Sequence, residues 1–78
     1  MRAVFSSEAL AAAEYDAVRG ILRVEFRDQS IYAYTGVPAP LYKDLLNASS
    51  KGAYFNRAIR GRFPHARVAS SSRGAFLS

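Results

Sequence analysis

The chain contains no cysteine and no tryptophan, and its 78 residues include a single histidine, His65. Without cysteine, neither a disulfide framework nor a thiolate metal site can form, which is compatible with a reducing compartment. His65 has no second imidazole with which to share a metal ion, so a zinc site is not expected. We therefore expect no metal and no other cofactor, and a small-molecule ligand is not favoured.

The sequence also has no stretch of about 18 apolar residues, which excludes a transmembrane helix. The N-terminal residues carry one arginine, Arg2, but no long apolar segment follows it, so they do not resemble a secretion signal. We therefore expect a cytoplasmic protein that does not act at a membrane. The length leaves room for one domain, and a domain of this size buries only about 60% of the surface of its unfolded chain.

Acidic residues are absent from the last third of the chain. Residues 1–50 carry five basic and six acidic side chains, whereas residues 51–78 carry six basic and no acidic ones. The net charge of +5 therefore arises entirely after residue 50. A segment with charge of one sign attracts polyanions such as nucleic acids. A solvated surface that only keeps the protein in solution explains the charge equally well.

Three antiparallel strands are predicted in the first half of the chain. Apolar and charged residues alternate over residues 21–27, a period that is typical of a half-buried strand. The β-branched and aromatic residues of segment 31–36 form the next strand, which Pro38 ends. The alanine-rich stretch 9–15 is compatible with a helix, but the turn signal at residues 16–20 favours a hairpin, and we predict a strand.

Two short helices are predicted after the strands. Pro40 suits the first turn of a helix over residues 40–48, in which the leucine and tyrosine side chains fall on one stripe. Ser50 is a suitable N-cap for a second helix over residues 51–60, and Gly61 ends it. The fold class is therefore α+β, a three-stranded antiparallel meander followed by two short helices packed on one face.

The domain boundaries follow from the same patterns. Residues 1–8 are expected to form a flexible leader, residues 9–68 the folded domain, and residues 69–78 a disordered serine-rich tail. The segment 63–68 is expected to be extended and to pack back on the domain.

Several spaced motifs resemble the KTSC domain. They are Tyr32-Ala33-Tyr34, Gly36-Val37-Pro38, Leu45-Leu46, the run from Ser50 to Asn56, Ile59-Arg60 and Phe63-Pro64. This domain is named from the C-terminus of some lysyl-tRNA synthetases and also occurs as a stand-alone small bacterial protein. The resemblance covers residues 7–68. The family has no firmly assigned biochemical function, and the resemblance implies RNA binding only through the synthetase context. Gln29 replaces a glycine that relatives often carry, and Ala33 replaces a residue that is often basic, which weakens a phosphate contact from this strand.

Tyr32 and Tyr34 share one face of the predicted strand 31–36. Paired aromatic side chains on a sheet stack nucleobases in RNA-binding domains, and the alternative is packing in the core. A two-residue loop at 28–29 places both tyrosines on the exposed face, whereas a three-residue loop at 28–30 places them under the helices, beside Val24 and Phe26, because a slip of one residue turns the strand over. Gln29 is not the glycine that a tight turn prefers, so we favour the longer loop and core packing.

Basic and polar residues of the last third are the other candidates for ligand contact. Lys51 lies at a helix N-terminus, where backbone N–H groups attract phosphate, although a plain N-cap is the commoner use of the preceding serine. Arg57 and Arg60 share a helix face and can bind phosphate in bidentate fashion, but a solvated face with ion pairs explains them equally well. The candidate nucleic-acid-binding residues are Lys51, Tyr54, Asn56, Arg57, Arg60, Arg62, Arg67, Tyr32 and Tyr34.

An enzyme is not expected, because one histidine and six acidic residues provide no recognisable nucleophile and base. We interpret His65 as a half-exposed packing residue. The sequence therefore predicts a small non-enzymatic module that binds nucleic acid, RNA in the first place, through its basic last third. The alternative is a protein–protein interaction module or accessory subunit, because arginine and aromatic residues are also enriched in protein interfaces.

Overall fold

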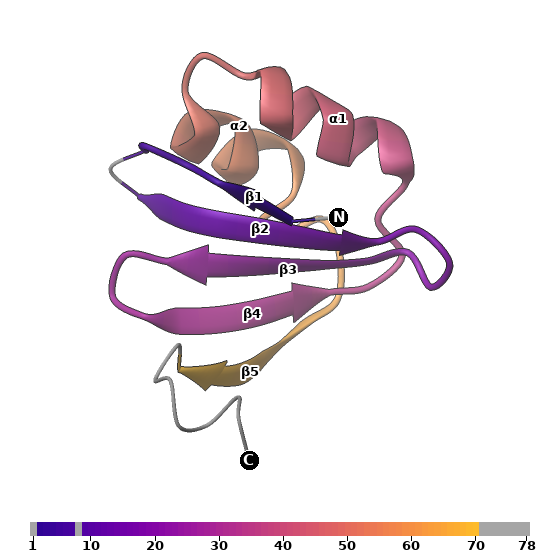
Figure 1. The fold of residues 1–78 in the computed structure, drawn as a ribbon. Helices are drawn as coiled ribbons and strands as arrows, with labels where there is room; N and C mark the ends of the chain where they lie inside the picture. The colour runs from indigo at the N-terminus through magenta and orange to yellow at the C-terminus, as the bar shows by residue number, and fades with distance from the viewer. Residues whose placement is uncertain (1, 8, 71–78) are drawn as a thin grey trace.

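The computed structural model describes residues 2–7 and 9–70, which form one five-stranded antiparallel sheet and two helices (Figure 1). The strands follow one another across the sheet in chain order: β1 (Arg2–Val4), β2 (Leu10–Asp16), β3 (Ile21–Phe26), β4 (Ser30–Tyr34) and β5 (His65–Ser70). The helices α1 (Ala39–Asn47) and α2 (Lys51–Ala58) connect β4 to β5 and lie on the same side of the sheet. No helix within the described ranges is long and apolar enough to cross a membrane.

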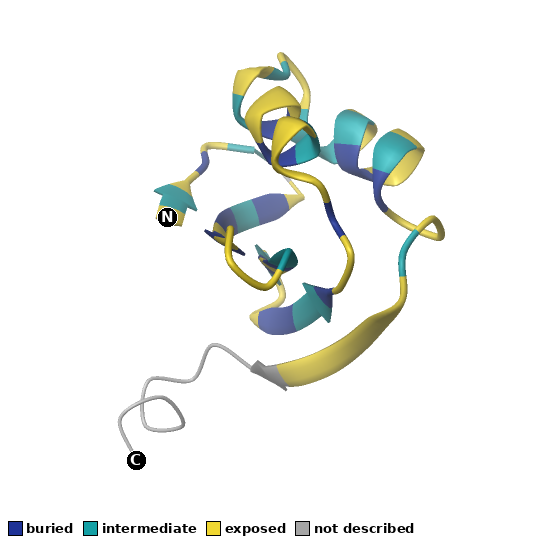
Figure 2. Ribbon diagram, turned by 90° about the vertical axis from the view of Figure 1, so that its right-hand side faces the viewer, coloured by how far each residue is buried: buried dark blue, intermediate teal, exposed yellow. Residues whose placement is uncertain are grey.

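The α+β class and the three central strands are confirmed, but the sheet has five strands rather than three. Arg2–Val4 pair with β2, so the expected leader contributes an edge strand. Ala69 and Ser70 belong to β5 rather than to the expected disordered tail, whose other residues, 71–78, lie outside the described residues. The sequence predicts segment 63–68 as extended but not as a strand of the sheet. Residues 65–68 are all exposed (Figure 2), so no hydrophobic alternation marks a strand there.

The hairpin between β3 and β4 turns both tyrosines of β4 towards the helices. Tyr32 pairs with Val24, and Tyr34 pairs with Leu22, so the prediction that they pack on the core side is confirmed. The connecting loop has three residues, as predicted, but it lies one position earlier in the chain, which shifts the pairing by two residues. A shift of two residues leaves the same face of the strand inward, because side chains alternate with a period of two.

The helices begin and end within two residues of their predicted limits. Pro40 lies in the first turn of α1, where its missing N–H leaves no hydrogen bond unmade. Gly61 has a φ of 77°, as expected for a glycine that follows a helix end. The predicted extended segment 63–68 supplies most of β5, which lies antiparallel to β4.

The core lies between the sheet and the two helices. Tyr15 of β2 stacks on Tyr42 of α1, with ring centres 5.1 Å apart and planes inclined by 17°. The Tyr15 hydroxyl also donates a hydrogen bond of 2.6 Å to the carbonyl oxygen of Val37, just before α1. The side chains with 0% exposure are those of Leu10, Leu22, Val24, Leu45 and Ile59.

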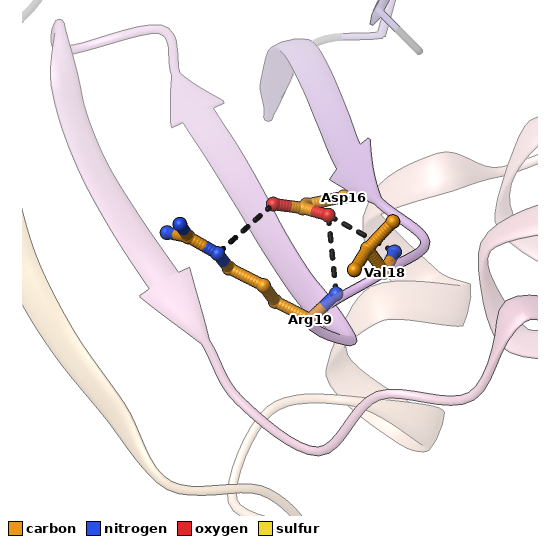
Figure 3. A network of polar contacts seen from close by, with 3 residues as sticks. All are labelled: Asp16, Val18 and Arg19. Carbon is orange, nitrogen blue, oxygen red and sulfur yellow. Dashed lines mark hydrogen bonds and ion pairs between the residues drawn. The ribbon is translucent and has the colours of Figure 1, made fainter.

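The loop between β2 and β3 is fixed by its own polar groups (Figure 3). The Oδ1 atom of Asp16 accepts hydrogen bonds from the backbone N–H groups of Val18 and Arg19, at 3.0 and 3.1 Å. Gly20 adopts a φ of 69°, and its carbonyl oxygen accepts a hydrogen bond of 2.9 Å from the N–H of Val37. The hairpin therefore holds the segment that leads into α1 and positions both helices over the sheet.

Candidate nucleic-acid interface

An open cleft of about 460 Å³ lies where β4 and β5 meet the end of α2. Ring side chains from four elements line it, and polar side chains complete its walls. The ring side chains are Phe26, Tyr32, Tyr34, Phe55 and His65, and the polar ones are Arg27, Asp28, Ser30 and Arg60. The cleft is on the side of the sheet that the helices cover, because Tyr32 and Tyr34 point to that side.

The rings pack against one another mainly edge to face. Phe26 lies edge-on to Tyr32 and to Phe55, with centres 5.8 and 5.5 Å apart. Tyr34 and Phe55 form a third such pair at 5.4 Å. His65 stacks on Tyr34 at 5.2 Å with planes inclined by 30°, and it lies tilted by 53° against Tyr32 at 5.8 Å. These ring contacts agree with the interpretation of His65 as a packing residue, but the residue is exposed rather than half-exposed.

Tyr34 is only 4% exposed, whereas Tyr32 is half-buried. Neither hydroxyl group forms a hydrogen bond with the residues that the structure describes. Burial raises the pKa of Tyr34 above its ordinary value of 10.0, and the nearby Arg60 guanidinium only partly opposes this effect. The Tyr34 hydroxyl therefore stays protonated at neutral pH and can donate or accept a hydrogen bond in the cleft.

Two arginines line the cleft, and their guanidinium groups differ in what they already bind. The Nε and Nη2 atoms of Arg27 donate to the carbonyl oxygens of Ser7 and Phe5, at 2.9 and 2.8 Å. Arg60 makes one long contact of 3.4 Å with Oδ1 of Asn56. Since a guanidinium group has five N–H donors, Arg60 keeps most of its donors for a ligand.

Asp28 is the one carboxylate among the residues that line the cleft. Its Oδ1 atom accepts hydrogen bonds from the hydroxyl group of Ser30 at 2.6 Å and from the N–H of Ser30 at 2.9 Å. These hydrogen bonds lower the pKa of Asp28 below its ordinary value of 3.8, and Arg67 contributes in the same direction. The carboxylate is therefore engaged in holding the β3–β4 loop.

Ser50 caps the N-terminus of α2. The Ser50 hydroxyl accepts a hydrogen bond of 3.3 Å from the N–H of Ala53. The Nζ atom of Lys51 donates to the carbonyl oxygen of Ala48 at 2.6 Å and lies 5.6 Å from the ring centre of Phe5. Lys51 is thus held against the protein and is not brought to the cleft.

The other predicted site residues surround α2 and the loop that follows it. The Arg57 guanidinium lies 5.4 Å from the ring centre of Tyr54, and the Nε atom of Arg62 donates to the carbonyl oxygen of Arg57 at 2.9 Å. Arg67 pairs with Tyr32 across β4 and β5, beside the cleft. The structure therefore brings together Tyr32, Tyr34, Arg60 and Arg67, whereas the residues outside the cleft are Lys51, Tyr54, Asn56, Arg57 and Arg62.

The opposite face of the sheet carries paired charges. Arg23 lies 3.9 Å from Glu14, and Arg2 lies 3.8 Å from Glu25. By contrast, no basic side chain of residues 51–67 forms an ion pair with a carboxylate of the described ranges. The basic side chains without an ion-pair partner therefore lie on α2, the loop after it and β5.

Six of the cleft residues named above are not among the predicted site residues: Phe26, Arg27, Asp28, Ser30, Phe55 and His65. Of these, Phe26 alternates with Val24 along β3, and Phe55 lies on the inward side of α2. The β3–β4 register brings Phe26 beside Tyr32, and the packing of α2 on the sheet brings Phe55 beside Tyr34. The sequence signal for them is the hydrophobic periodicity, which does not distinguish a core from the wall of a cleft.

Residues 6–63 match the KTSC domain family. The crystal structure of a KTSC domain protein from Yersinia pestis has a similar fold, with a TM-score of 0.85 and 32% sequence identity over 88% of this chain and 97% of that chain. A protein from Tsukamurella paurometabola is 39% identical over 57 residues, which cover 73% of this chain and 85% of that protein.

A lysine–tRNA ligase from Nostoc punctiforme is also similar, being 43% identical over 49 residues. This alignment covers 63% of the present chain but 9% of the ligase. Ligases from Trichormus variabilis and a further Nostoc strain are 39% and 41% identical, with 9% and 10% of their lengths covered. The chain thus spans about a tenth of the length of these relatives.

Proposed function

This chain belongs to the KTSC domain family, and we propose that it is a small non-enzymatic module that binds nucleic acid, RNA in the first place. The binding surface would comprise α2, the loop after it and β5. The similarity to lysine–tRNA ligases favours RNA over DNA, because those relatives act on a transfer RNA by name. The similar segment is a small part of each ligase, so it supports an RNA-contacting role and not the ligase activity.

The observation that carries the proposal is the unpaired positive charge of this surface. Five basic side chains occur between residues 51 and 67 with no acidic residue among them, and no carboxylate of the described ranges pairs with any of them. Three arginines elsewhere, Arg2, Arg19 and Arg23, do have acidic partners. Such a distribution attracts a polyanion to one side of the molecule.

The proposal is tested by titrating the protein into labelled single-stranded RNA, single-stranded DNA and duplex RNA, with fluorescence anisotropy as the readout. We expect the affinity to fall steeply between about 50 and 200 mM salt, because bound phosphates release counterions. Replacing Arg57 and Arg60 by glutamine should weaken binding and reduce the slope of log K against log salt by about 1.4, since each phosphate contact on a single strand contributes about 0.7.

The matched control is the double variant Arg19→Gln/Arg23→Gln, which removes the same charge from side chains that already have acidic partners. It should bind with little change in affinity or salt slope. If wild-type protein binds none of the three nucleic acids at low salt, or if the two double variants lose affinity equally, the proposal is wrong.

A protein–protein interaction module is the second candidate. Val4 on the edge strand β1 is 77% exposed, and Val68 on the other edge strand, β5, is 44% exposed. Exposed apolar residues on edge strands favour pairing with a strand of a partner. A protein that stays bound to the chain after nuclease treatment, together with no affinity for nucleic acid, would favour this candidate.

A further inference from the structure

The aromatic wall of the cleft has one ring that can accept a stacking partner. Tyr32 is half-buried, and its neighbours Phe26 and His65 meet it edge-on and tilted, at interplanar angles of 80° and 53°. Neither contact is a parallel stack, so a face of the Tyr32 ring remains for a planar group. Flat aromatic side chains on a sheet are the usual stacking platform for an unpaired base.

A polar group in the same cleft lacks a partner within the protein. Tyr34 as a residue is only 4% exposed, and its hydroxyl forms no hydrogen bond with the described residues. No fully buried side-chain nitrogen or oxygen atom of the described residues lacks a partner, so this hydroxyl is open to solvent at the cleft. Tyr34 lines the cleft, so a ligand there can supply the missing partner.

The charge at the cleft suits an anionic group next to a planar one. Arg60 lines the cleft with most of its donors available, and Arg67 lies beside it opposite Tyr32. The carboxylate of Asp28 already accepts two hydrogen bonds from Ser30. The cleft volume of about 460 Å³ is in the range for one small ring system, since small-molecule sites span about 300–1,000 Å³, and it cannot admit a duplex.

We propose that this cleft takes one unpaired nucleobase of a single strand, stacked on Tyr32 and hydrogen-bonded to the Tyr34 hydroxyl, with the adjoining phosphate on Arg60. This inference rests on the proposed function and names the site and the form of nucleic acid that the basic surface would bind. Single strands are therefore preferred over duplexes, because a paired base cannot reach the cleft without leaving its stack.

The test uses short single-stranded RNA with one 2-aminopurine, whose fluorescence is quenched when it stacks on an aromatic ring. Wild-type protein should quench the single strand and leave the same base in a duplex unchanged. Tyr32→Leu should abolish the quenching and weaken binding by about 5- to 150-fold, the range for loss of one stacked base. Tyr32→Phe keeps the ring and should keep the quenching, and Tyr34→Phe should weaken binding by about 3- to 10-fold.

The outcomes separate this inference from the proposed function. The cleft assignment is overturned if binding depends on salt but 2-aminopurine is quenched at no position of the strand. It is also overturned if duplex and single strand bind with equal affinity. Either outcome leaves the basic surface as the binding site. Absence of binding to any nucleic acid overturns both. The protein is also mixed with free 2-aminopurine riboside monophosphate as a comparison. If its fluorescence is quenched as strongly as that of the strand, the cleft binds free nucleotides and the inference is overturned. If Tyr32→Leu does not fold, Tyr34→Phe and the wild-type quenching decide the matter.

Discussion

The hydrogen bond between Tyr15 and Val37 offers a direct measure of how the sheet holds the helices. The hydroxyl of Tyr15, a residue that is 5% exposed, donates to the carbonyl oxygen of Val37, which is 1% exposed, over 2.6 Å. Tyr15→Phe keeps the ring and its stacking on Tyr42 but deprives the buried carbonyl oxygen of this donor. Leaving a buried acceptor unsatisfied costs about 1–3 kcal/mol, so we expect the free energy of unfolding to fall by about 2 kcal/mol.

The assay is thermal and urea unfolding followed by circular dichroism. In a domain of this length each kcal/mol shifts the midpoint by about 4–8 °C, so the Tyr15→Phe midpoint should fall by about 8–16 °C. Tyr34→Phe is the matched control, because it removes a hydroxyl that is open to solvent and has no hydrogen-bond partner among the described residues. Its stability should stay within about 0.5 kcal/mol of wild type. Equal effects of the two substitutions, or no effect of Tyr15→Phe, would refute the reasoning.

Two further predictions concern the β3–β4 loop. Gln29→Gly should raise the free energy of unfolding by up to about 1 kcal/mol in urea unfolding, because φ is 74° there and a left-handed residue other than glycine costs about 1–2 kcal/mol. Gln29→Ala should give no such gain. Asp28→Asn should lower the thermal midpoint at neutral pH. Because the pKa of Asp28 is lowered in the folded protein, its carboxylate stabilises the fold above pH 3.8, and this effect is lost as the pH falls through the folded-state pKa. The difference in midpoint between wild type and Asp28→Asn should therefore shrink below pH 3.8.

The sequence predicts the elements that bury a face and does not predict the edges of the sheet. Alternation along residues 21–27 locates β3, and the stripe of apolar residues locates both helices, because burial imposes the period. No described residue of β1 or of segment 65–68 is buried, so the sequence describes the first as a leader and the second only as an extended segment. Their pairing depends on the backbone of β2 and β4, which a hydrophobicity pattern does not record.

The candidate site depends on these same edges. The basic residues are visible in the sequence, but His65 and Arg67 reach Tyr34 and Tyr32 only because β5 pairs with β4. The contact of Lys51 with Ala48 also has no sequence signal, since it depends on how the turn between the helices folds. The sequence therefore predicts the chemistry of the site, and the tertiary pairing decides which of its residues meet.

The cleft combines features that stability alone does not favour. The Tyr34 hydroxyl opens to the cleft without a hydrogen-bond partner among the described residues, although a phenylalanine would fill the same space. Arg60 lies nearby with no acidic partner among the described residues. Departures of this kind from the rules of stable packing are expected at functional sites. Tyr34→Phe therefore separates function from stability. If the hydroxyl serves a ligand, the variant binds more weakly but unfolds no more easily than the wild type. A variant that unfolds more easily instead would mean that the hydroxyl serves the fold.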